Sequence, residues 1–284
     1  MPQVWNKNKK NTFCRQKRIF LPSLPKTIKT DRSRASIIFG NMPYRKQKFE
    51  SGEKYHLILR ALDDNLIFKD TDDYFRGIFC LYEFNNLKPV NISIRRRDRA
   101  VEKRREKPIE VGLRTIFEND KRDKLVNVLS FCFMPNHIHL LVEQIKDNGI
   151  SKFMQKVGTG LAKYFNKKYQ RKGHVFQDTF KSVHIEDDNQ LMTVFNYIHV
   201  NPLSLIEPGW KEKGIKNVKV VIKFLENYKW SSYQDYIGRK NFPSVTDRDF
   251  LSEAMEEAGG CKNAIKNWLE YKKDIIKGNN LFLE

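Results

Sequence analysis

The stretch LVNVLSFCFMPNHIHLLV, residues 125–142, decides the fold. Residues 125–133 are apolar and rich in β-branched and aromatic side chains, which predicts a buried strand. Met134, Pro135 and Asn136 then supply the residue types of a turn, and residues 137–142 predict the next strand. Two strands joined by so short a connection are typical of an antiparallel hairpin, so an antiparallel sheet is expected.

Strands and helices alternate on both sides of this hairpin. Alternating elements that are joined partly by a hairpin predict an α+β fold, an antiparallel sheet with helices packed on one face. The expected elements are a strand over 54–60, a turn at 63–65, a helix capped by Thr71, an amphipathic helix over 150–169, a strand over 174–185, and a helix from Asp187 or Asp188 that ends at Pro202.

The composition points to a polyanionic partner. The chain has 284 residues with 53 Lys and Arg against 34 Asp and Glu, a net charge of +19. Three strips hold this excess: residues 1–50 carry +11, 95–108 carry +5 and 151–182 carry +7, so that the other 188 residues sum to −4. Excess lysine can also serve solubility alone, but strips of this kind favour a nucleic-acid partner.

These charge strips also suggest how the chain is divided. Residues 1–50 have little apolar periodicity and are expected to form a flexible basic arm. Residues 51–238 form the expected main domain, which a basic insertion at about 95–108 interrupts. Residues 239–284 form a helical extension, with helices expected over 246–258 and 264–276. This extension could cover the sheet, extend a dimer interface or touch DNA.

The sequence gives no sign of a membrane or of an oxidising compartment. No apolar run approaches the roughly 18 residues that a membrane span needs. Basic residues interrupt each apolar stretch near the N-terminus, so no signal peptide is expected. The four cysteines lie far apart without a CxxC pair, which argues against disulfides and thiolate zinc sites. A cytoplasmic, nucleoid-associated protein is the expectation.

His137 and His139 are the first candidates for chemistry. Side chains alternate along a strand, so histidines at i and i+2 project from the same face. Two converging imidazoles suit a divalent or transition metal, and zinc is among the ions that would accept them. An isolated pair of this kind is more often found on an ordinary sheet surface. A metal site therefore requires a third ligand and a reactive group from elsewhere.

The helix before Pro202 offers both. Tyr197 and Asn201 lie four residues apart, so they share one side of a helix and can point at one site. An amide oxygen is a hard ligand that would complete a His137, His139 and Asn201 set. A phenol has an ordinary pKa of about 10 and needs help to act as a nucleophile. The plain alternatives are a core aromatic for Tyr197 and a helix C-cap for Asn201.

Six segments together resemble the HUH single-tyrosine transposases, which act on single-stranded DNA, and among them most resemble the bacterial REP-associated tyrosine transposases. An HxH pair followed some 60 residues later by the tyrosine signature is a specific pattern, and the resemblance covers roughly residues 54–238. The segments are Met134–Val142, Tyr164–Asn166, Gly173–Gln177, Phe180–Ser182, Tyr197–Pro202 and Trp230–Tyr233.

The resemblance implies a mechanism and a fold. It makes Tyr197 the nucleophile, His137 and His139 metal ligands, and Asn201 the third ligand, with Mg²⁺ or Mn²⁺ as the ion. Tyr197 would attack a backbone phosphate of single-stranded or hairpin DNA, leaving a 5′-phosphotyrosine and a free 3′-OH. The implied fold is a ferredoxin-like sheet that carries the histidines, with the tyrosine helix across it. The protein would be a homodimer or a monomer.

The chain departs from the family pattern at three places. The family usually has Arg-Gly after its first strand, whereas Arg60 is followed by Ala61. The arm and the insertion have no clear family counterpart. Gly158 and Gly160 lie inside a predicted helix, where each costs roughly 1 kcal/mol relative to Ala. Glycines there permit close packing or mark a kink.

Several residues are candidates for DNA contact. Four lysines repeat at helical spacing within 150–169, between the HxH strand and the tyrosine helix, although such a face is often only solvated. His56 and His199 are expected to be structural or rim residues. The candidates are Lys152, Lys156, Lys163, Lys167, His174, Gln177, Lys181, Arg95, Arg96 and Arg97.

The sequence therefore predicts a metal-dependent single-strand DNA endonuclease and strand transferase. Three other functions remain open. The enzyme could be a domesticated processor of chromosomal repeat hairpins. It could be a DNA-binding protein that does not cleave, although the intact set of Tyr197, His137, His139 and Asn201 argues against this. An ordinary metal hydrolase that uses water would not need Tyr197.

Overall fold

A computed structural model describes residues 48–95, 97, 120, 122–177 and 179–280. Four strands and two long helices follow the order β-α-β-β-α-β. They are β1 (Lys54–Arg60), α2 (Thr71–Glu83), β2 (Val126–Met134), β3 (His137–Gln144), α4 (Gly149–Lys168) and β4 (Lys181–His184).

The four strands form one antiparallel sheet in the order β2-β3-β1-β4. A β-α-β-β-α-β chain with this strand order is the ferredoxin-like arrangement. The predicted α+β class and antiparallel sheet are therefore confirmed. The two strands of the predicted hairpin, β2 and β3, pair from Val126 opposite Gln144 to Met134 opposite His137.

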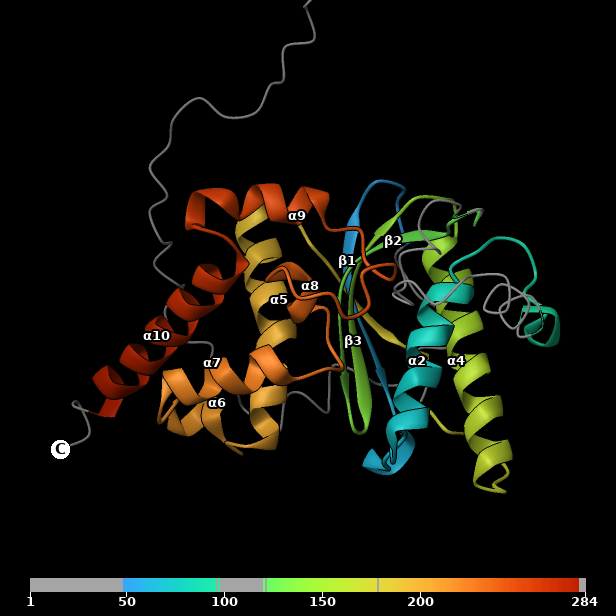
Figure 1. The fold of residues 1–284 in the computed structure, drawn as a ribbon, viewed down its shortest axis with the longest axis horizontal. Helices are drawn as coiled ribbons and strands as arrows, with labels where there is room; N and C mark the ends of the chain where they lie inside the picture. Colours follow the sequence, from blue (N-terminus) through green and yellow to red (C-terminus); the bar gives the residue numbers. More distant parts are fainter. Residues whose placement is uncertain (1–47, 96, 98–119, 121, 178, 281–284) are drawn as a thin grey trace, which may run out of the picture. The chain divides into compact units, whose positions relative to one another are not determined.

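Helices cover both faces of this sheet, whereas the sequence predicted helices on one face. Figure 1 shows the sheet between α2 with α4 on one side and α5 (Asp188–Val200) on the other. The first core holds the inward residues of α2 and α4 against Leu57, Ile138 and Leu140. The second core joins α5 to Leu141. The fold needs both cores because β3 buries side chains on both faces: Ile138 and Leu140 on one, and His139 and Leu141 on the other.

A bulge in β2 sets which of its residues face each core. The pairing register with β3 shifts between Val128 and Ser130. Before the shift Val128 faces the first core, and after it Phe131 and Phe133 do. An extra residue in one strand reverses the alternation beyond it. Leu129, Cys132 and Met134 thereby join the second core, beside the histidines of β3.

Most predicted elements form, and their ends differ in understandable ways. The N-cap of α2 is Asp70 rather than Thr71, because the Asp70 side chain accepts a hydrogen bond from the backbone N–H of Asp73 and Asp73 returns one. Asp187 caps α5, as predicted. The strand expected over 174–185 is shorter, since only Lys181–His184 forms a continuous ladder with β1. Residues 63–65 lie in and just after a short 3-10 turn, η1 (Leu62–Asp64).

The C-terminal part packs against α5 on the side of the second core. Within the extension, α9 is shorter than the helix predicted over 246–258, whereas α10 is longer than that predicted over 264–276. α10 contacts both α5 and α7, so this extension supports the helix that carries Tyr197. The elements are η3 (Asn201–Leu205), α6 (Trp210–Lys213), α7 (Val218–Asn227), α8 (Tyr233–Tyr236), α9 (Asp249–Ala254), η4 (Glu256–Ala258) and α10 (Cys261–Asn280).

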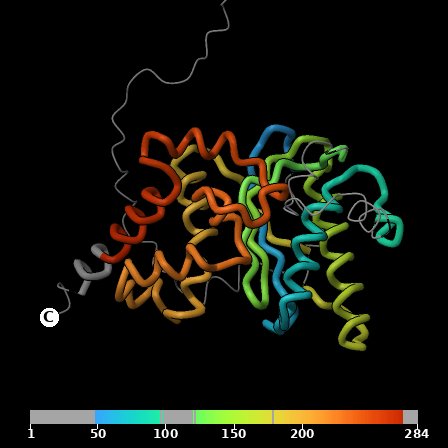
Figure 2. The backbone as a smooth tube through the Cα atoms, viewed as in Figure 1, coloured from blue at the N-terminus to red at the C-terminus, as the bar shows by residue number. Residues whose placement is uncertain are grey.

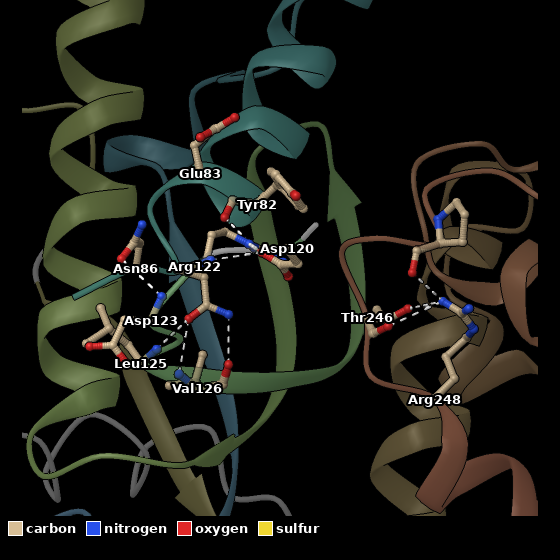
Figure 3. Close-up of polar contacts among 12 residues, drawn as sticks. Tyr82, Glu83, Asn86, Asp120, Arg122, Asp123, Leu125, Val126, Thr246 and Arg248 are labelled. Atoms are coloured by element: carbon tan, nitrogen blue, oxygen red, sulfur yellow. Dashed lines mark hydrogen bonds and ion pairs between the residues drawn. The ribbon is translucent and has the colours of Figure 1, made fainter. Parts of the chain in front are cut away.

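The chain leaves α2 and enters β2 at a clamp built from polar side chains. The buried Asn85 accepts hydrogen bonds from the backbone N–H of Leu125 and of Val126 and donates one to the Val126 carbonyl. Arg122 donates to the Tyr82 carbonyl at 2.6 Å and pairs with Asp120, as Figure 3 shows. The two ends of the segment that contains the basic insertion are therefore fixed beside each other.

Two of the three basic strips lie largely outside the described residues. The arm, residues 1–50, is described only from residue 48, and of the insertion at 95–108 only Arg95 and Arg97 are described. Residues 47–284 form one compact unit. None of the helices in the described ranges has the length and apolar character needed to cross a membrane.

Replacement of the two helical glycines of α4 is expected to have opposite effects. A Cβ on Gly160 would overlap the packed ring of Phe84, whereas a Cβ on Gly158 meets nothing within 4 Å. Gly160→Ala should therefore lower the free energy of unfolding by about 1–3 kcal/mol. Gly158→Ala should raise it by about 0.5–1 kcal/mol, because Ala loses less entropy in a helix. Urea unfolding measures both, and equal effects would contradict the packing.

Asp73 is expected to make the fold sensitive to acid. Burial acts to raise the pKa of Asp73, but hydrogen bonds from Lys168 and Tyr169 outweigh it, so the pKa is lowered. Because the folded pKa lies below the unfolded value of about 3.9, this stabilisation is present above that pH and is lost as pH falls through the folded pKa.

The corresponding variant is Asp73→Asn. It should lower the free energy of unfolding by about 1–3 kcal/mol at pH 7, since charged hydrogen bonds are replaced by neutral ones. The difference from the wild-type protein should shrink below the pKa of Asp73. Urea unfolding at neutral and at acid pH tests this, and a difference that does not depend on pH would contradict it.

Candidate active site

The predicted histidine pair lies on the sheet face that α5 covers. In β3, Ile138 and Leu140 face the first core, so His137 and His139 face the opposite way. Their ring centroids are 4.8 Å apart with the planes at 80°. Antiparallel pairing sets Met134 opposite His137 and Cys132 opposite His139, which gives the pair apolar neighbours on β2.

A third histidine joins this pair from the other neighbouring strand. His56 of β1 lies diagonally across from His139, which pairs with Ile58. The two ring nitrogens His56 Nε2 and His139 Nδ1 are 3.0 Å apart, so a hydrogen bond joins the rings. His56 was expected to be a structural or rim residue, but it is buried and belongs to the site.

A chain of hydrogen bonds orients His137 from the other end. Its Nδ1 lies 2.6 Å from the Asn136 side-chain oxygen, which only accepts, so Nδ1–H donates. Asn136 Nδ2 donates in turn to Asp64 at 3.3 Å, and Asp64 pairs with Arg60. Nε2 of His137 and Nε2 of His139 have no hydrogen-bond partner among the described residues. Each imidazole thus keeps Nε2 free of hydrogen bonds to the described residues.

Burial keeps these imidazoles neutral. It lowers the pKa of His56 to about 4. It also lowers the pKa of His137 to about 4, with further lowering by Arg60 and Lys211. The pKa of His139, only 3% exposed, is held well below its usual range by burial and by the neighbouring histidines. Near pH 7 the rings are therefore uncharged, the form in which imidazole binds a metal.

Tyr197 lies against the histidines from the opposite element. Leu191, Phe195 and Ile198 of α5 are buried, and Tyr197 lies on the side of the helix that faces β1 and β3. The centroid of its ring is 5.6 Å from that of His139 and 6.1 Å from that of His56, with the planes near perpendicular. The structure thus brings the predicted nucleophile and the histidines together.

A lysine that the sequence did not single out completes the surroundings of the phenol. Lys211 Nζ donates a hydrogen bond to the Tyr197 hydroxyl at 3.1 Å and lies 4.8 Å from the centre of its ring. It belongs to α6, fourteen residues after Tyr197, beyond the end of the tyrosine helix. Periodicity gives no signal for such a contact, because the connection through η3 to α6 has no regular repeat.

Asn201 follows Tyr197 by one helical turn, where α5 passes into η3. It is 4% exposed, and its Nδ2 has no hydrogen-bond partner in the described part of the chain. Its backbone N–H bonds to the Tyr197 carbonyl, so it does act as the helix C-cap. Its position one turn from Tyr197 agrees with the predicted spacing. The ligand role of its side chain remains a prediction.

The four predicted lysines of α4 lie on the other side of the sheet from the histidines. Lys152, Lys163 and Lys167 are exposed there. Lys156 instead donates to backbone carbonyls in the segment after α2, among them Leu87 at 3.2 Å. The structure therefore does not bring this lysine face to the site. The contact of these lysines with DNA stays a prediction, and their distance from the histidines gives it no support.

Two other predicted DNA contacts do lie near the histidines. The backbone N–H of Gln177 donates to the Arg60 carbonyl, and Arg60 lies opposite His137 in the pairing of β1 with β3. Lys181 of β4 is opposite Ile58, so it shares the sheet face of His56. His174 is exposed in the same loop that leads to β4. Of the arginines, Arg95 pairs with the buried Glu83, Arg97 is exposed, and Arg96 lies outside the described residues.

The histidine pair fits a metal ion in chemistry and in orientation. Both Nδ1 atoms are held by neighbouring groups, which is how ligating histidines are usually fixed, and both Nε2 atoms are left for a ligand. Among the described residues no group of three or more His, Cys, Asp or Glu side chains is arranged to hold a metal. A metal site here would therefore need a ligand of another type, and the predicted one is the amide oxygen of Asn201.

Fold and site together define a class: a ferredoxin-like sheet with paired histidines on one face and a tyrosine opposite them on a helix. Comparison with known families gives the same class. The model of the family described as "Transposase IS200 like" matches residues 88–201, which include the histidines, Tyr197 and Asn201. This segment is therefore similar to the IS200-like transposase family, and the resemblance to single-tyrosine transposases is confirmed over it.

The other two comparisons are with solved structures and with curated proteins. A solved structure titled "Structure of the REP associates tyrosine transposase bound to a REP hairpin" is 13% identical and covers 73% of this chain and 96% of its own, with a TM-score of 0.41. No curated protein matches the chain. The family match by itself supports a DNA-processing function of the single-tyrosine transposase type, in a family that generally uses a divalent metal.

Proposed function

We propose that the protein is a metal-dependent single-strand DNA endonuclease and strand transferase that links itself to DNA through Tyr197. The observation that carries this proposal is the position of the Tyr197 ring, 5.6 Å from the His139 ring across the second core. A hydrolase that uses water has no need of a tyrosine there. The pairing of an HxH strand with a facing tyrosine is what supports covalent chemistry.

His137, His139 and Asn201 would hold Mg²⁺ or Mn²⁺. When bound, the ion polarises a phosphate oxygen and makes the phosphorus easier to attack. His56 and Asn136 orient the two imidazoles, so that neither ring needs to turn when a ligand arrives. Asn201 is buried, and its Nδ2 has no hydrogen-bond partner among the described residues, so the carboxamide is available to a ligand.

The reaction follows from the groups of the chain itself. Tyr197 Oη forms a bond to phosphorus while the bond to the 3′ oxygen breaks, which gives a 5′-phosphotyrosine and a free 3′-OH. The phenol proton passes to water, and the 3′ oxygen takes a proton from water. One phosphate ester replaces another, so the step is reversible without ATP. A 3′-OH that attacks the phosphotyrosine rejoins the strands.

Hairpin-containing or single-stranded DNA is the proposed substrate. The protein would meet this substrate in the DNA of the nucleoid. Gln177, Lys181 and Arg60 border the histidines and could contact the strand near the cut. A homodimer or a monomer remains the expected state. A domesticated role on chromosomal repeats would use the same chemistry, while a DNA-binding protein that does not cleave would have no use for the oriented histidines.

Tyr197→Phe tests the nucleophile. Wild-type protein incubated with single-stranded hairpin DNA and Mn²⁺ should give a protein–DNA adduct on a denaturing gel. The adduct should disappear in Tyr197→Phe and with EDTA, because one removes the attacking oxygen and the other the ion. Tyr271→Phe, a change at an exposed tyrosine of α10, is the matched control and should react normally. Cleavage that survives in Tyr197→Phe would refute the assignment.

His56→Leu tests the support of the metal site. Leu cannot form the hydrogen bond with His139 Nδ1 that orients the His139 ring for ligation through Nε2. Mn²⁺ affinity should therefore fall about 10–100-fold. His56→Gln keeps an acceptor and should retain most of the affinity. Isothermal titration with Mn²⁺ in the absence of DNA measures this.

His184→Leu is the control for that titration, since His184 pairs with Glu53 on β4, away from the site. It should bind Mn²⁺ like the wild-type protein. Unchanged affinity in His56→Leu would show that His56 does not orient His139. A wild-type protein that binds no Mn²⁺ would remove the metal from the proposal.

A further inference from the structure

Lys211 is the charged group that contacts the phenol oxygen of Tyr197. Its Nζ lies 3.1 Å from that oxygen and donates to it, and the same ammonium lies 4.8 Å from the ring centre. Among the described residues no other side chain is hydrogen-bonded to this hydroxyl. A lysine that donates to the oxygen leaves the phenol's own proton free to leave.

The fold holds this lysine in place although its side chain is exposed. The preceding residue, Trp210, is 4% exposed in the second core, where its ring lies 6.0 Å from that of Trp268 on α10. Gly209 has a φ of +80°, a conformation that favours glycine and that starts α6 at this point. The backbone of Lys211 is thus fixed one residue from a buried anchor, and only its flexible side chain extends to Tyr197.

The neighbours of the phenol give the ammonium a clear role. The rings of His56 and His139 lie beside the Tyr197 ring, with centroids 6.1 Å and 5.6 Å from its centroid. Arg60, on the neighbouring strand, is paired with Asp64. A phenolate formed here would therefore have Lys211 as its contacting cation.

We propose that Lys211 is a catalytic residue, which stabilises the Tyr197 phenolate during attack on the DNA phosphate and again when that phenolate leaves on rejoining. This role rests on the proposed covalent function. The ammonium keeps its proton throughout: the phenol proton goes to water, the Oη–P bond forms, and the P–O3′ bond breaks with the 3′ oxygen protonated by water. In the reverse step the same ammonium receives the departing phenolate.

The experiment compares two lysines of the same short helix. Lys211→Met removes the contact, while Lys213→Met removes an equal charge from α6 at an exposed position that has no bond to Tyr197. Adduct formation with single-stranded hairpin DNA and Mn²⁺ is timed at saturating DNA, and DNA affinity is measured separately in EDTA. Lys211→Arg serves as the conservative variant.

The rate of adduct formation at pH 7 should fall about 10–100-fold in Lys211→Met, in line with the loss of one group that stabilises developing charge. Lys213→Met should change it less than about 3-fold, because it weakens the general electrostatic attraction of DNA by the same single charge as Lys211→Met but leaves the contact with Tyr197 in place. Lys211→Arg should retain most of the rate, because arginine keeps a positive charge and hydrogen-bond donors at this position. Equal rates for the two methionine variants would overturn the proposal.

The same assay separates this inference from the proposed function. A wild-type protein that forms no adduct with single-stranded hairpin DNA and Mn²⁺ would refute the covalent function and with it any catalytic role for Lys211. A wild-type protein that forms the adduct, while Lys211→Met reacts as fast as Lys213→Met, would refute the role of Lys211 alone.

Discussion

Strand β3 lies at the centre of the sheet and is buried on both faces, and the arrangement of the rest follows from this constraint. Its even-numbered residues from Ile138 onward pack into the core under α2 and α4. The alternation of a strand then forces His137 and His139 toward the other side, where α5 must cover them. A slip of one residue in the pairing would place the histidines under α2 and α4 and the aliphatic side chains under α5. The register of β3 therefore determines the position of the site.

Burial of the histidines has electrostatic consequences for everything near them. Imidazoles that cannot take up protons near pH 7 leave the region without compensating charge, so each remaining ion matters more than it would in water. Arg60 is balanced by Asp64, while Lys211 approaches the phenol directly. The site thus combines uncharged imidazoles on the sheet with a positive charge from α6 beside the phenol.

The sequence predicted the parts of the site that lie within single elements. The HxH spacing and the four-residue interval from Tyr197 to Asn201 are local patterns, and both elements formed as expected. His56 was missed because its role depends on the register between β1 and β3, which no local pattern encodes. Lys211 was missed because an irregular connection separates it from Tyr197.

The lysines of α4 also show that local sequence patterns do not determine tertiary position. Helical periodicity identified which side of α4 faces solvent, and the buried residues Phe153, Val157 and Leu161 agree with it. Periodicity does not say which face of a sheet a helix will cover. That depends on how the chain crosses from β3 through α4 and β4 into α5, which Figure 2 traces from one side of the sheet to the other. The lysines consequently lie across the sheet from the histidines.

The clamp at Asn85 has a consequence for how this fold can diversify. Because Asn85 bonds directly to Leu125 and Val126, the chain between them leaves and returns at neighbouring points on the edge of the domain. The entropic cost of closing such a loop grows only with the logarithm of its length. Segments of very different length and charge can therefore be exchanged here during evolution, while β2 keeps its register and the histidines keep their place.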